Sequence, residues 1–231
     1  MYPGEHIATQ FQAAGRVTDW LGDRFDGLPQ IVGDCLNPRP APPSTAPPGG
    51  GDFVVSLDKW PLTGSVTVKK LDETMNLPGG STFTADTNLT KHTLSGRLSV
   101  PTFKEHIKII GLPVEIRVSL TSQGTSGTVS LDGAGRLHIH GTAKATVGIE
   151  SAGELGVHIP IGCRTSKPAE FALDFDGPVS ALGGGGLGFS GTSEFPSLTG
   201  CGLWAPLLQS FFSGPGNGYR FTVAPPAPVA Y

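Results

Sequence analysis

From Phe53 onward, apolar and polar residues alternate in short runs, and residues that favour turns recur about every ten positions. The runs SVTV (65–68) and VEIRVSL (114–120) alternate most regularly. Alternation places every second side chain on one face of a strand. The separators LPGG, TSQGTSG, LDGAG and SAGE carry the Gly, Asn, Asp and Ser that tight turns require. The pattern therefore predicts a mainly β fold of about nine to eleven antiparallel strands, in a sandwich or a barrel.

Composition agrees with a chain rich in turns and limits the possible partners. Gly 34 and Pro 21 are high, whereas charged residues make up only 15% of the chain. The net charge is -3, and the 16 Lys and Arg residues are scattered and not interleaved with aromatic residues. We therefore expect no nucleic-acid partner.

The first part of the chain differs from the rest. Apolar residues between positions 5 and 27 recur every three or four positions, which predicts an amphipathic helix. This helix packs on its own domain or docks on an envelope protein or a membrane surface. The predicted organisation is a helical segment at 1–36, a Pro/Gly-rich linker at 37–51, a β domain at 52–224 and an extended tail at 225–231.

A second helix is predicted near the end of the β domain, within residues 203–218. Pro206 suits a first helical turn, and Gly214 followed by Pro215 suits a stop. The helix would plug an end of the β domain or cover a sheet edge, and its apolar residues could also line a lipid pocket. These candidate ligand-binding residues are Leu203, Leu207, Leu208, Phe211 and Phe212.

The cysteines bear on the compartment. Cys163 and Cys201 lie 38 residues apart at the borders of extended runs, so we predict a disulfide between them, worth roughly 4 kcal/mol by the loop-entropy model. Two buried free thiols are the alternative. Cys35 would then be a free thiol or form an intermolecular bridge.

Targeting signals leave the start of the chain open. The first residues have neither a basic region nor an apolar region of a signal peptide, and no apolar run of about 18 residues is present. Three interpretations remain: a cytoplasmic protein, a mature protein with a new Met1, or a start placed too late.

Two pairs of polar residues are candidates for chemistry. His138 and His140 are two apart on a predicted strand and share a face, a spacing found at metal sites. A third ligand would have to come from His92, His106, His158 or a carboxylate. Asp174 and Asp176 share a strand face in the same way and could bind calcium or cleave glycosides. We interpret both pairs as solvent-facing.

Other motifs do not support catalysis. Neither GTSGT nor GFSGT fits the Gly-x-Ser-x-Gly nucleophile turn, and LGGGGLGFSG lacks the Lys and helix start of a phosphate loop. We therefore expect no catalytic residue and no cofactor.

Several segments together resemble a group of secreted, β-rich actinobacterial envelope proteins of unknown function. They include LSGRLSVPTF, IPIGCRTSKPAEFAL and FPSLTGCGLWAPLLQSFFSGPGNGYRFTV. Those proteins similarly pair a Cys-Arg-Thr segment with a later Thr-Gly-Cys-Gly or Ser-Gly-Cys-Gly segment and a Pro-Gly-Asn. The resemblance covers residues 62–224. It implies an exported, disulfide-bonded protein, and it transfers no activity or site residue.

The hypothesis from the sequence is a non-enzymatic, exported structural or interaction protein of the cell envelope. The first alternative is a carrier with a cavity for a lipid or other small apolar ligand. The second is a metal-dependent hydrolase centred on His138 and His140.

Overall fold

The computed structural model describes residues 52–154 and 157–226. The chain divides into two units after Asp52, and the description below concerns the second. The predicted helix at 5–27, the linker and Cys35 lie outside the described residues, as does most of the tail. The strands are β1 Val54–Val68, β2 Glu73–Asn76, β3 Thr82–Asn88, β4 Thr93–Ile109, β5 Leu112–Leu131, β6 Arg136–Glu154, β7 Val157–Thr165, β8 Ala169–Pro178, β9 Leu187–Phe195, β10 Leu198–Thr199 and β11 Gly214–Val223. The helices are η1 Val179–Gly183, η2 Gly202–Trp204 and α2 Ala205–Phe212.

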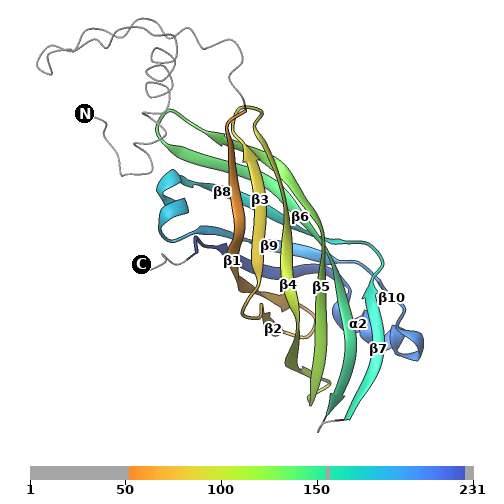
Figure 1. The fold of residues 1–231 in the computed structure, drawn as a ribbon. Coiled ribbons are helices and arrows are strands. Elements are labelled where there is room, and N and C mark those ends of the chain that lie inside the picture. The colour runs from red at the N-terminus through yellow and green to blue at the C-terminus, as the bar shows by residue number, and fades with distance from the viewer. Residues whose placement is uncertain (1–51, 155–156, 227–231) are drawn as a thin grey trace, which may run out of the picture. The chain divides into compact units, whose positions relative to one another are not determined.

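The eleven strands of the described region form one antiparallel sheet (Figure 1). Nine of them pair in the order β10-β7-β6-β5-β4-β3-β1-β11-β9, and the other two pair off this path, β2 with β1 and β8 with β6. The prediction of a mainly β, antiparallel domain is confirmed. The sheet is open, however, whereas we had expected the two separate sheets of a sandwich or the closed ladder of a barrel.

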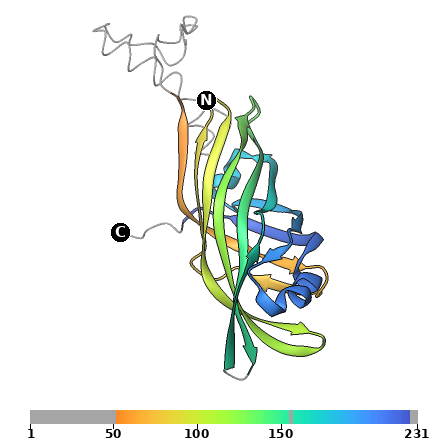
Figure 2. The ribbon, with the colours of Figure 1, turned by 90° about the vertical axis from the view of Figure 1, so that its right-hand side faces the viewer.

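A bend in β1 explains why a single sheet can enclose a core. The first half of β1 pairs with β3 and the second half with β11, and the register shifts between Leu57 and Trp60. Lys59 lies in the shift with a φ of 51°, a left-handed conformation typical of bulges. In Figure 2, β1 runs along the sheet and then turns across it. The bend carries β11 and β9 over the concave face of the same sheet.

The central strand β6 is long enough to serve two partners on one side. Residues Arg136–Ala145 pair with β8, and residues 148–154 pair with β7. β8 then lies against β9, but no ladder of the described residues joins these two strands. Ring packing holds them: Phe171 of β8 contacts Phe195, Tyr219 and Phe221 edge-on, with ring centroids 5.3 to 6.4 Å apart. The Tyr219 hydroxyl donates to the Ala172 carbonyl at 2.8 Å.

The predicted short C-terminal helix is present as α2, and it stops at Phe212 before Gly214. Leu208 and Phe212 of α2 are buried, whereas Leu207 of α2 and Leu203 of η2 are exposed. Cys163 at the end of β7 and Cys201 before η2 are joined by a disulfide, with their Cα atoms 4.5 Å apart. The disulfide therefore ties the helical segment to β7.

Within the described residues, no helix is long and apolar enough to cross a membrane.

Candidate functional site

The two polar pairs singled out in the sequence face each other across neighbouring strands. In the register of β6 and β8, His138 lies opposite Asp176 and His140 lies opposite Asp174. Alternation turns all four side chains to the outer face, because their strand neighbours Leu137, Ile139 and Leu173 are buried in the core. The interpretation of two solvent-facing pairs thus holds for each strand, but the sequence alone did not bring the pairs together.

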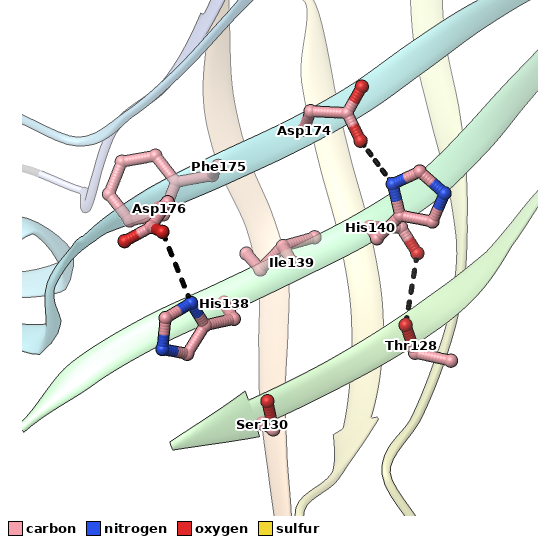
Figure 3. Close-up of a pocket in the computed structure, with 8 residues that line it drawn as sticks. All are labelled: Thr128, Ser130, His138, Ile139, His140, Asp174, Phe175 and Asp176. Atoms are coloured by element: carbon pink, nitrogen blue, oxygen red, sulfur yellow. Dashed lines mark hydrogen bonds and ion pairs between the residues drawn. The ribbon is translucent and has the colours of Figure 1, made fainter. Parts of the chain in front are cut away.

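His138 lies between two carboxylates. Its Nδ1 atom is 3.4 Å from Asp176 Oδ2 (Figure 3). Its Nε2 atom is 3.4 Å from Asp132 Oδ2. Asp176 is also held by the guanidinium of Arg136, whose Nε donates to Oδ1 at 3.1 Å. Each ring nitrogen of His138 therefore has a carboxylate oxygen within 3.4 Å.

The turn before β6 supplies the carboxylate that sequence reasoning missed. Asp132 accepts hydrogen bonds from the backbone N–H groups of Arg136 at 2.8 Å and Ala134 at 2.9 Å. These bonds, that from Arg136 above all, lower the pKa of Asp132, and the nearby His138 adds to the effect. In the sequence, Asp132 was assigned only to the turn LDGAG. Its spacing of six residues from His138 carried no recognisable signal, because only the β5–β6 hairpin brings the two together.

The second pair is simpler. His140 Nδ1 contacts Asp174 Oδ1 directly, and the backbone carbonyl of His140 accepts a hydrogen bond from Thr128 Oγ1 at 3.4 Å. In the first pair, the pKa of Asp176 is lowered mainly by the hydrogen bond that Arg136 donates to it. Both histidines are thus paired with carboxylates on the outer face of the sheet.

A shallow hollow of about 410 Å³ lies over these side chains. It is lined by Thr128, Ser130, His138, Ile139, His140, Asp174, Phe175 and Asp176. The described residues contain no group of three or more His, Cys, Asp or Glu that could hold a metal ion. His92, proposed as a third ligand, instead bonds the Val129 carbonyl through Nδ1 at 3.2 Å. The arrangement is a ladder of ion pairs across strands, which stabilises strand pairing.

The other two candidate histidines belong to a separate cluster around Glu115 of β5. His106 Nε2 on β4 is 3.5 Å from Glu115 Oε2, and His158 Nε2 on β7 is 3.3 Å from Oε1. Lys104 Nζ lies closer, at 2.7 Å from Oε1, and its hydrogen bond is the main reason that the Glu115 pKa is lowered. One carboxylate therefore links three strands at this end of the sheet.

The same end of the sheet exposes apolar side chains. Of the nine large hydrophobic residues that are exposed in the described region, seven lie here, and the other two are Phe53 and Val54. Ile110 and Leu112 lie in and beside the β4–β5 turn, and Val157 and Ile159 lie on β7 beyond the β6–β7 turn. Figures 1 and 2 both place these turns and α2 at the same end. We call this set the apolar end: Ile110, Leu112, Val157, Ile159, Leu203, Trp204 and Leu207.

Sequence reasoning found only part of the apolar end. Leu203 and Leu207 were candidates for a lipid pocket, and both are exposed, at 99% and 37%. Leu208 and Phe212 of the same predicted stripe are core residues instead, and Phe211 is half-buried. The strand residues were missed because alternation predicts which face a side chain occupies, but not where along the strand the covering layer ends.

Two further hollows bear on ligand binding. An apolar cavity of about 20 Å³ lies in the core, lined by residues such as Met75, Phe103 and Phe171. A polar hollow of about 530 Å³ lies beside the β7–β8 turn, where Ser166, Lys167 and Glu194 are among the lining residues.

Comparison with protein-family models, with curated proteins and with solved structures finds no match for this chain.

Proposed function

We propose that the protein is a non-enzymatic, exported component of the cell envelope that works by binding a partner surface through its apolar end. The observation that carries the proposal is the gathering of seven of the nine exposed large hydrophobic side chains at one end of the described region. Exposed apolar residues scattered singly are ordinary on protein surfaces, whereas their gathering in one region of the surface favours an interaction site.

The disulfide supports the exported location. Cys163 and Cys201 are 1% and 3% exposed and form their bond within one chain. Disulfides of this structural kind persist in oxidising compartments and are rare in the cytosol.

The two alternatives receive less support. A carrier of a drug-sized or larger apolar molecule needs a cavity of about 300 Å³ or more, and the apolar core cavity has about 20 Å³. For metal-dependent hydrolysis, His138 and His140 would need further ligands, but the described residues contain no group of three or more His, Cys, Asp or Glu that could hold a metal ion.

A photo-reactive residue can test the function in the cell that makes the protein. We would place it at Leu112 or Leu203 in the apolar end and, as the matched control, at Ser126, which is exposed on β5 away from that end. Adducts with a discrete partner molecule are expected from positions 112 and 203 and not from position 126. Equal labelling from all three positions would contradict the proposal.

The location needs its own test. Thiols would be blocked by alkylation in intact cells, and the peptides containing Cys163 and Cys201 would then be examined by mass spectrometry. A linked, unalkylated pair is expected, whereas two alkylated thiols would contradict export.

A further inference from the structure

We propose that the surface bound by the apolar end is a lipid layer, into which the β4–β5 turn inserts its apolar tip. This inference rests on the proposed function and names the chemistry of its partner.

The first argument is the conformation of Ile110. Ile109 pairs with Leu112, so Ile110 and Gly111 form a two-residue turn, and both have positive φ, at 52° and 78°. Asn-Gly or Asp-Gly is the favoured sequence for such a turn, because Asn and Asp tolerate the left-handed region and a β-branched side chain does not. Ile110 is also 76% exposed, so it contributes little buried apolar surface to the stability of the fold. A strained, exposed isoleucine points to a contact outside the chain.

The second argument is that three separate elements present apolar groups at the same end. Val157 on β7 is 70% exposed, and Leu203 in η2 is 99% exposed. Trp204 follows Leu203, with 43% of its surface exposed. Tryptophan is enriched where an apolar layer meets water, because its ring is apolar and its indole N–H is polar.

The shape of the apolar end favours a fluid partner over a second copy of the chain. The residues of the β4–β5 turn protrude, so a protein partner would have to offer a matching apolar pocket. The two larger hollows are lined mainly by ionisable and hydroxyl side chains, although Ile139 and Phe175 also line the first, and the apolar cavity is far too small. A lipid layer adapts to a protruding tip without a preformed pocket.

Charge is compatible with this partner. Residues 104–117, which carry the β4–β5 turn, contain three basic and two acidic side chains, whereas the whole chain has a net charge of -3. Residues 198–218, which include α2, contain no charged side chain. The β4–β5 turn and the α2 segment therefore carry no net negative charge, and anionic lipids do not repel them.

Vesicle flotation with the full chain tests the inference. The probes are vesicles of phosphatidylcholine alone and of phosphatidylcholine with an equal amount of phosphatidylglycerol. We expect the wild-type protein to float with vesicles, more strongly with the mixed ones. Ile110→Asn should lower the partition coefficient about tenfold, because it removes one buried aliphatic side chain.

Two control variants separate the tip from general effects. Lys59→Asn introduces the same residue at a position with nearly the same φ, in the bend of β1. Val54→Asn removes an exposed apolar side chain outside the apolar end. Both should float like the wild type. Circular dichroism of each variant confirms that it is folded before flotation.

The outcomes separate lipid insertion from the proposed function, which is partner binding through the apolar end. Equal flotation of wild type and Ile110→Asn would overturn lipid insertion, and so would a wild-type protein that stays off both kinds of vesicle. If the protein ignores vesicles but position 112 is photo-linked to another protein, the lipid inference fails and the proposed function stands. If neither lipid nor protein contacts position 112, both fail.

Discussion

Ile110 illustrates a conflict between local stability and surface chemistry within a single residue. Its φ of 52° places a β-branched side chain in the left-handed region, next to a glycine that suits the same region. Neither fact can be read from the letters IIGL, because the sequence shows apolar residues continuing through the turn but not the backbone that they adopt.

The first prediction concerns this strain. Ile110→Asn should raise the free energy of unfolding by about 1 kcal/mol, because asparagine accepts the left-handed conformation and little buried surface is lost. Urea unfolding of the variant and the wild type measures the change. A destabilised Ile110→Asn would show that the isoleucine supports the fold itself, and the argument for an external contact would lose its basis.

The second prediction concerns Asp132 and Asp176 near the ion-pair ladder and Glu115 of the separate cluster. Hydrogen bonds from Arg136 lower the pKa values of Asp132 and Asp176, and a hydrogen bond from Lys104 lowers that of Glu115. Because each pKa is lower in the folded than in the unfolded chain, their stabilisation is present at neutral pH. It is lost as the pH falls below about 4 and through the folded-state values.

Unfolding curves at neutral pH and at about pH 3 test this effect. Asp176→Asn should reduce the loss of stability in acid, since one of the responsible groups is gone. Glu194→Gln, at an exposed carboxyl on β9, serves as the control. Identical acid sensitivity in wild type and Asp176→Asn would contradict the assignment.

At the scale of elements, the sequence predicted where strands occur but not which predicted runs join into one continuous strand. The runs FVVSL and GSVTVKKL were read as separate strands, yet both belong to β1, because the Lys59 bulge bends the strand without ending it. Pro196 directly follows the end of β9, as expected for a residue that cannot donate to a ladder. Pro101 does not end β4, because it lies within the register shift between Val100 and Phe103, where its missing N–H is tolerated.

The aromatic cluster around Phe171 holds β8 against β9 and β11 in the absence of a ladder in the described region. We predict that Phe171→Ala costs about 3 to 5 kcal/mol, since it leaves a cavity among three packed rings. Tyr219→Phe keeps the ring and removes only the hydrogen bond to Ala172, at a cost of about 1 kcal/mol. Chemical denaturation of both variants gives the two values. Equal costs would mean that the ring packing is not what joins these strands.

The disulfide makes a separate contribution at the same scale. Replacing Cys163 and Cys201 together by alanine should lower the free energy of unfolding by about 4 kcal/mol, because the 38-residue loop is no longer closed in the unfolded chain. Reductant should then have no further effect on the double variant. A double variant as stable as the oxidised wild type would contradict this role.

At the scale of the whole molecule, alternation predicted a β-rich domain but not its openness. The sheet folds over itself because β1 bends and because β6 pairs with both β8 and β7 along one edge. Neither feature has a local sequence signal. The apolar end was missed for the same reason. Its strand residues follow the same alternation as the core residues, but no other part of the described structure covers them. Of the candidate site, the sequence predicted both pairs on their faces, and only strand pairing added Asp132.

Oxidative footprinting by mass spectrometry tests the central claim most directly, by comparing purified protein with protein in the isolated envelope. We predict that Ile110, Leu112, Val157, Ile159, Leu203, Trp204 and Leu207 become protected together in the envelope. Phe53 and Val54, which are exposed outside the apolar end, should react equally in both samples. Unchanged reactivity of the seven side chains would contradict the account, because the apolar end would then face water where the protein works.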